Sequence, residues 1–278
     1  MGMRIGTNIT ALNAQHSLSI TKGALDRTME KLSSGSRINK ASDDAAGLAV
    51  SENLKAQMRG LKVANRNTQD GISLLQTAEG SLAEVGNMLV RMRELSIQAS
   101  SDTITDRERK MTGGEYNQLM AEIDRISAST EFNGTKLLNG EGESFDFQVN
   151  TKNSNTIDRI SFEPSEADTN TIALGVRFSN IFSKQGAQQS LDIIDRAIQG
   201  VSGLRAHFGS IQSRLNSTVE NINTSLESMA TANSRIRDSD IAEESSELAK
   251  RNLMLQSGTA VLAQANQQPG QALSLLNK

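Results

Sequence analysis

One stretch decides the fold: IDRAIQGVSGLRAHFGSIQSRLNSTVENINTSLESMATANSRI, residues 194–236. Stepping by seven from its first residue meets an apolar side chain every time, without a polar interruption. The column is Ile194, Val201, Phe208, Leu215, Ile222, Met229 and Ile236. A seven-residue apolar repeat is typical of helices that pack along their length as coiled coils. The sequence therefore predicts a long helix lying against at least one other.

A second helical stripe lies earlier in the chain and supplies the expected partner. Its apolar residues step by three and four, which places them on one helical face. They are Leu75, Ala78, Leu82, Val85, Leu89 and Met92. We expect one helix over about 43–100, ~85 Å long at ~1.5 Å per residue, and a third over about 106–129. The predicted fold class is mainly α, a long antiparallel helical hairpin or coiled-coil rod.

The middle of the chain has a different period. Phe145, Phe147 and Val149 alternate with polar residues, and the segment 172–178 alternates in the same way. A period of two between turn-forming residues indicates short strands, so we expect a small β-hairpin region at about 140–186. Six of the seven phenylalanines lie between 132 and 182. They predict an aromatic cluster, which we expect at the far end of the helical hairpin.

Both ends of the chain lack formal charge. Residues 252–277 and, with a neutral histidine, residues 5–21 contain no Asp, Glu, Lys or Arg. The C-terminal stretch is rich in Asn and Gln, whose amides would be unsatisfied in a bilayer, so we expect no membrane span. We instead expect contacts with other copies of the chain. The predicted self-assembly residues are Leu18, Leu25, Leu32, Ile241, Leu248, Leu255 and Leu262.

Composition excludes several functions. The chain has no cysteine, and its net charge of −3 gives no basic field for nucleic acid. His16 and His207 lie far apart, without ligand-spaced carboxylates. Asp43 and Asp44 are better explained by the start of a helix, where Ser42 can cap, than by acid–base catalysis. We expect no enzyme, no metal site and no cofactor.

Several sequence motifs resemble those of a known protein family. LSSGSRINKASDDAAGLAV at 32–50, DGISLLQTA at 70–78, VRMRELSIQA at 90–99 and EFNGTKLL at 131–138 resemble bacterial flagellin. The stretch SRIRDSDIAEESSELAKRNLMLQSGTAVLAQANQQPGQALSLLN at 234–277 resembles the flagellin C-terminus. These motifs span nearly the whole chain. The chain is identified as a minimal member of that family, without large outer domains.

The resemblance implies an architecture and a location. Residues 1–44 and 235–278 would form an inner coiled-coil domain, and 45–234 a rod-like helical domain. The chain would be exported without a cleaved signal peptide and would polymerise into the extracellular helical filament used for swimming. The implied partners are other copies of itself, an export chaperone, and cap and hook-associated proteins.

Alternatives remain at this point. A hook–filament junction protein shares the terminal patterns, and a helical signalling or receptor-binding module would also carry long heptads. Arg91, Leu95 and Glu115 resemble the flagellin surface read by a vertebrate innate receptor, with Arg91 and Leu95 on one helical face. Leu95 equally fits a continuation of the core stripe, with Arg91 as a solvated charge.

Overall fold

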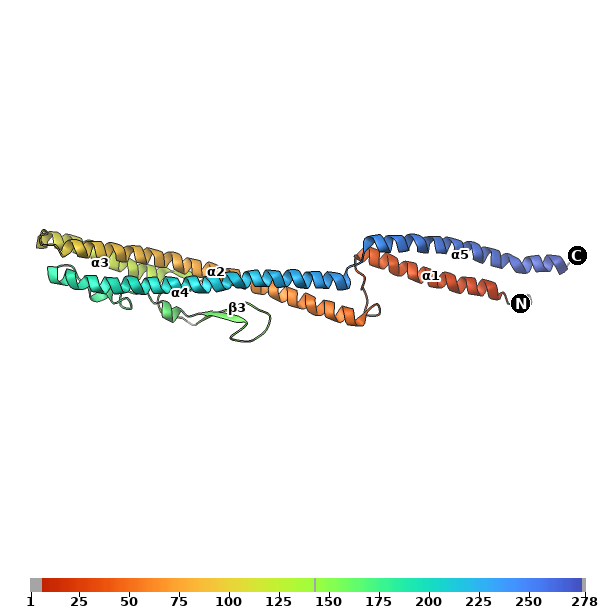
Figure 1. Cartoon of the computed structure of the whole chain (residues 1–278), viewed down its shortest axis with the longest axis horizontal. Helices are drawn as coiled ribbons and strands as arrows, with labels where there is room; N and C mark the ends of the chain where they lie inside the picture. The colour runs from red at the N-terminus through yellow and green to blue at the C-terminus, as the bar shows by residue number, and fades with distance from the viewer. Residues whose placement is uncertain (1–6, 143, 277–278) are drawn as a thin grey trace. The chain divides into compact units, whose positions relative to one another are not determined.

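The computed structural model describes residues 7–142 and 144–276. The chain divides into two compact units. Unit 1 contains residues 1–56 and 228–278, and unit 2 contains residues 57–227. The helices are α1 (Ile9–Ser34), α2 (Ala45–Ala99), α3 (Asp106–Ser129), α4 (Lys184–Arg237) and α5 (Ile241–Leu276), with short 3₁₀ helices η1 (Pro164–Ala167) and η2 (Val176–Phe178). The mainly helical fold class is confirmed (Figure 1).

In unit 2, α2 and α4 run antiparallel. Asn65 Nδ2 donates to Asn223 Oδ1 over 2.8 Å, and further along α2 Arg93 pairs with Asp195 over 2.6 Å. Residue numbers rise along α2 as they fall along α4, which is the predicted hairpin geometry. Helix α3 runs back along α2, where the Arg91 guanidinium pairs with Glu115 over 2.9 Å. Unit 2 is therefore built on three long, mutually packed helical segments.

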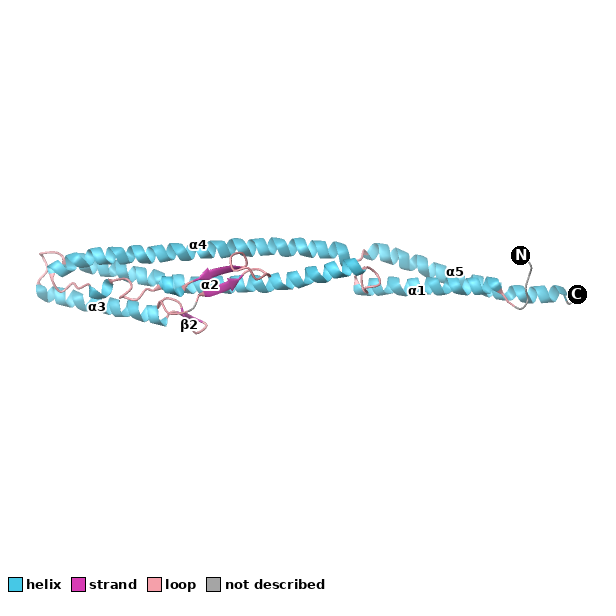
Figure 2. Ribbon diagram, turned by 90° about the horizontal axis from the view of Figure 1, so that it is seen from below, coloured by secondary structure: helices cyan, strands magenta, loops and turns pink. Residues whose placement is uncertain are grey.

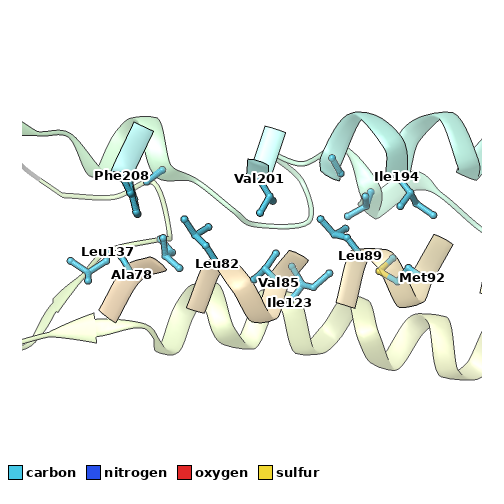
Figure 3. Packing of buried hydrophobic residues seen from close by; sticks show 14 of the residues in the cluster. Ala78, Leu82, Val85, Leu89, Met92, Ile123, Leu137, Ile194, Val201 and Phe208 are labelled. Atoms are coloured by element: carbon cyan, nitrogen blue, oxygen red, sulfur yellow. The ribbon is translucent and has the colours of Figure 1, made fainter. Parts of the chain in front are cut away.

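The two predicted stripes meet in the core of this unit. All six residues of the α2 stripe are fully buried, and in α4 the column is buried from Ile194 to Ile222. Figure 3 shows Leu82, Val85 and Leu89 facing α4, with Ile123 of α3 beneath them. Met229 and Ile236 continue the column in unit 1 and are half-buried. The heptad prediction is confirmed residue by residue in unit 2.

The sharp connection between α2 and α3 is fixed by hydrogen bonds. Arg109 of α3 is 7% exposed, and its guanidinium donates to the carbonyls of Ala99 and Ser101 at 2.9 and 2.8 Å. The Ala99 carbonyl is at the end of α2, where helix carbonyls lack intrahelical partners, and the Ser101 carbonyl lies in the connection that follows. Thr105 and Glu108 form a capping box that starts α3. A buried guanidinium in the first turn of α3 thus binds the carbonyls at and just beyond the end of α2.

Two short hairpins interrupt the helices. The first pairs β1 (Glu131–Phe132) with β2 (Thr135–Lys136). Its turn residues Asn133 and Gly134 both have positive φ, 49° and 81°, as a two-residue hairpin requires. The second pairs β3 (Phe145–Gln148) with β4 (Arg159–Phe162), Phe147 opposite Ile160. Strands are thus present within the region predicted at 140–186.

Two glycines of α2 let the second hairpin approach the helix closely. A Cβ at Gly71 would lie 2.9 Å from the Phe147 ring, and one at Gly60 would lie 2.6 Å from Thr151 Cγ2. Figure 2 shows β3 and β4 lying along α2. The Phe162 ring meets Phe208 of α4 edge to face, with centroids 5.2 Å apart. The hairpin therefore closes over both helices of the rod.

The expected position of the aromatic cluster was wrong. Phe145 and Phe162 stack with centroids 6.1 Å apart, beside Phe208, which lies 24 positions into α4 after Lys184. The far end of the hairpin is instead the segment between α2 and α3, closed by Arg109. The cluster lies away from the far end because α3 runs back along the rod before the chain forms β3.

The alternation at 172–178 does not form a strand. Turns and η2 occupy this segment, with Ile172 and Phe178 63% and 82% exposed and Val176 buried. Its backbone bonds are local, from Gly175 N to Ile172 O, and Asp124 of α3 accepts from both the amide and the hydroxyl of Thr171. A strand needs a neighbouring edge, and these polar groups are already satisfied without one.

A polar contact fixes η2 against α3. Tyr116, the only tyrosine of the chain, is fully buried, and its hydroxyl lies 2.5 Å from Ser179 Oγ. Burial is the main cause that raises its pKa. The phenol therefore stays neutral and hydrogen-bonded inside unit 2.

Two glycine substitutions in α2 test the close approach of the β3–β4 hairpin to this helix. Gly71→Ala forces the Phe147 ring to move, whereas Gly80→Ala meets nothing within 4 Å. We expect Gly80→Ala to raise the free energy of unfolding by up to about 1 kcal/mol through helix propensity. Gly71→Ala should lower it by about 1–3 kcal/mol through overpacking. Guanidinium denaturation followed by circular dichroism measures both, and equal effects would contradict the packing described.

Candidate assembly surface

Helices α1 and α5 pair along their length in unit 1. Asn8 Nδ2 donates to the carbonyl of Ala265 over 2.7 Å, Leu18 lies against Gly258, and Lys31 pairs with Glu244 over 3.3 Å. The first contact joins the start of α1 to the later part of α5, so the helices are antiparallel. Figure 1 shows them side by side.

The predicted self-assembly residues form the seam of this pair, with one exception. Six of the seven are half-buried, neither enclosed nor free: Leu18, Leu25, Leu32, Leu248, Leu255 and Leu262. Ile241, at the start of α5, is 52% exposed. Two helices alone cannot enclose their common seam, because each covers only one side of the other.

Beyond the seam, large apolar side chains point to solvent on both helices. Each is more than half exposed: Ile9, Leu12, Ile20 and Met29 on α1, and Leu253, Met254 and Val261 on α5. Exposed apolar residues that gather on one pair of helices mark an interaction surface.

A groove follows one side of the pair. One part of about 750 Å³ is lined by Leu253, Lys250 and small residues of α5, with Thr21 of α1. A second part of about 310 Å³ shares Thr21 and Met254 and continues past Gly258. Small residues on its floor and apolar residues at its edge suit the docking of a helix.

The two histidines singled out in the sequence lie in different units of the structure. Among the described residues, no three His, Cys, Asp or Glu side chains gather as a metal site would require. His16 is exposed on α1. His207 of unit 2 lies 4.0 Å from Glu166. No helix in the described part of the chain is both long and apolar enough to cross a bilayer.

One of the two acids before α2 caps the helix, and the other holds the turn that precedes it. Asp44 Oδ1 accepts from the amide of Gly47 over 2.8 Å, so Asp44, and not Ser42, is the capping residue. Asp43 Oδ2 accepts from the amides of Lys40 and Asn39, which lower the pKa of its carboxyl. Both carboxylates are thus occupied by backbone groups.

Comparisons with known proteins agree with this architecture. The family model for the bacterial flagellin N-terminal helical region matches residues 5–143, and the model for the C-terminal helical region matches residues 191–276. The chain belongs to the flagellin family. Only residues 144–190 lie between the two matched regions, so it is a minimal member without large outer domains.

Relatives extend this result over the full chain. A flagellin of Halalkalibacterium halodurans is 43% identical, with 99% of this chain and 100% of the relative covered. The flagellar filament 33 kDa core protein of Treponema phagedenis is 40% identical at the same coverage. The crystal structure of Bacillus cereus flagellin matches with a TM-score of 0.50 at 32% identity, covering 56% of this chain and 88% of that one.

Family membership settles the general function. The chain is a structural subunit of the extracellular bacterial flagellar filament and is not an enzyme. The hook–filament junction protein and the helical signalling module receive no support.

Of the three residues that resemble a receptor-binding surface, Arg91 and Glu115 are exposed and Leu95 is not. The Arg91 guanidinium pairs with Glu115 and Glu94 at 2.9 Å each, and all three side chains are about half exposed. Leu95, however, is 1% exposed and belongs to the core of unit 2. The core-stripe interpretation of Leu95 is therefore correct, and an exposed Leu95 beside Arg91 is wrong.

This placement predicts different effects for two substitutions one helical turn apart. Leu95→Ala should lower the free energy of unfolding by about 2–5 kcal/mol because it leaves a cavity. Arg91→Ala should change it by less than about 1 kcal/mol, since its ion pairs are solvent-exposed. Ile97→Ala, at a 49% exposed position of the same helix, is the control. Equal stability of the Leu95 and Ile97 variants in thermal denaturation would contradict the burial.

Proposed function

We propose that the chain polymerises through the paired helices α1 and α5, whose seam and exposed apolar residues are covered by other copies. The observation that carries this proposal is the half-burial of six seam leucines beside seven exposed apolar side chains. Contacts between unlike surfaces of identical subunits do not close on themselves and generate an open helical filament. The surface needs no reactive group.

The charge distribution supports the same assignment. Residues 252–277 carry no formal charge, and a filament repeats every surface charge on each neighbouring subunit. Like charges held close together in a low-dielectric interior repel strongly. The part of α5 that follows Arg251 carries no formal charge and avoids this repulsion where copies pack most closely.

The family resemblance assigns roles to the parts of the chain. We propose that residues 1–44 and 235–278 form the inner coiled-coil domain of the filament and 45–234 the rod around it. An export chaperone and the cap and hook-associated proteins are the proposed partners before and during assembly. A host innate receptor is a further proposed partner, with its contact limited to exposed residues such as Arg91 and Glu115.

A single charge in the seam tests the proposed function. Leu255→Asp places a carboxylate between α1 and α5 where neighbours would exclude water, at a cost of several kcal/mol. We expect its critical concentration for polymerisation to rise by more than about 100-fold. Ser245→Asp introduces the same charge near the start of α5, where the helix dipole favours it, and should polymerise normally.

Sedimentation after seeding measures both variants against the unmodified chain. If the unmodified chain stayed soluble, the proposed function would be lost. Normal polymer from Leu255→Asp would remove this seam from the assembly surface.

A second prediction concerns the order of the terminal helices before assembly. Helices that bury little apolar surface are marginal alone, so α1 and α5 should open readily in the monomer. Limited proteolysis of monomer should trim the chain to about residues 45–235, with the same cleavage slowed in polymer. Equal resistance of both ends in monomer and polymer would show that assembly does not order them.

A further inference from the structure

A cationic cleft lies in unit 1 beside the end of α1. Its volume is about 570 Å³, and its charged lining is Arg27, Lys31, Arg37, Arg251, Asp43 and Asp44. Both carboxylates accept backbone hydrogen bonds, and two of the four cations are already ion-paired, Lys31 with Glu244 and Arg251 with Glu247. Arg27 and Arg37 have no carboxylate partner among the described residues, so the cleft has unused guanidinium donors.

The arginines of the cleft are only partly paired. Arg27 Nε donates to the Gly23 carbonyl of its own helix at 3.2 Å, and Arg37 Nη2 donates to the Ile236 carbonyl at 2.8 Å. Arg251 pairs with Glu247 through Nη2, while its Nε is buried without a hydrogen-bond partner among the described residues. A buried donor without an acceptor is costly, and a carboxylate is the acceptor that an arginine fork fits best.

Unit 2 carries a surface of the opposite sign. Its loops 138–142 and 163–168 lie side by side, joined by the Thr169 amide donating to the Leu138 carbonyl at 3.0 Å. Glu141, Glu163 and Glu166 are exposed on them. Lysine and arginine are absent from 137–151 and from 160–176. We call loops 138–142 and 163–168 the acidic loop pair.

The cations near the acidic loop pair are few. His207 Nε2 lies 4.0 Å from Glu166, and Glu141 accepts from the Asn139 amide. Among the described residues, Glu163 has neither an ion pair nor a side-chain hydrogen bond. Its carboxylate is thus available to a cation from outside the unit.

We propose that the cationic cleft of one copy receives the acidic loop pair of a second copy. The inference rests on the proposed self-assembly and adds a charged, orienting contact to it. Apolar helix packing is tolerant of sliding, whereas a buried arginine–carboxylate contact fixes register. Guanidinium groups without a carboxylate partner on one surface and free carboxylates on another also suit a heterologous contact, in which each copy uses a different surface toward each neighbour.

Charge reversal on each side, alone and combined, tests the proposal. Arg27→Glu should raise the critical concentration for polymerisation about tenfold or more, because it places a carboxylate opposite the acidic loop pair. Glu163→Lys should do the same from the other side. The double variant Arg27→Glu, Glu163→Lys should return to within about threefold of the unmodified chain.

Matched variants separate this contact from a general effect of charge. Lys22→Glu makes the same change at an exposed position of α1 outside the cleft and should stay within about threefold of the unmodified chain. Arg27→Gln removes the cation without adding repulsion, and should make polymerisation less sensitive to salt. Circular dichroism confirms that each variant is folded before seeding.

The outcomes distinguish this inference from the proposed function. If the unmodified chain polymerises while Arg27→Glu or Glu163→Lys does so equally well, the charged contact is absent and the proposed function stands. Loss in both single variants without recovery in the double variant also overturns the pairing. A chain that fails to polymerise without any substitution would instead remove the proposed function itself.

Discussion

The rest of unit 2 depends on one interaction, the aliphatic seam between α2 and α4. Aromatic residues are only 3% of the chain, so burial of Leu, Ile, Val and Met must supply most of the stabilisation, at about 1.5–3 kcal/mol for each fully buried side chain. The seam sets the separation of the two helices. Helix α3 and the β3–β4 hairpin then pack on a surface that already exists, and Gly71 and Phe208 only adjust how closely the hairpin lies.

Unit 1 uses the same heptad spacing with a different result. Its seam residues are half-buried where those of unit 2 are fully buried, since a third element is missing on each side. The difference is one of the number of neighbours and not of sequence pattern. A short helical pair gains too little from burial to offset the conformational entropy of ordering it. In the assembly that we propose, copies of the chain provide the missing neighbours, and one surface would stabilise both the polymer and the fold.

Periodicity allowed much of this to be predicted from the sequence. A repeat of seven identifies the buried face of a helix wherever it is sustained, as from Ile194 to Ile222. For Leu95 the same logic offered a core position, but it left a receptor contact open as the alternative. Features that depend on distant groups were not predictable. Asp124 and local turns satisfy the polar groups of segment 172–178, where the alternation predicted a strand. No pattern in the sequence marks Arg109 as a buried guanidinium. The cleft around Arg27 joins residues more than 200 positions apart in the sequence. The spacing of apolar residues shows which face of a helix is apolar, but it does not show which segment packs against that face.

The burial of Tyr116 has a consequence for spectroscopy. The chain contains no tryptophan and this single tyrosine, so its intrinsic fluorescence arises from one phenol inside unit 2. That signal reports the loss of packing around α3 and η2 and is insensitive to events in α1 and α5. A melting curve from tyrosine emission would therefore follow unit 2 alone, whereas one from far-ultraviolet circular dichroism follows the helices of both units. Their disagreement would measure how independently the two units unfold.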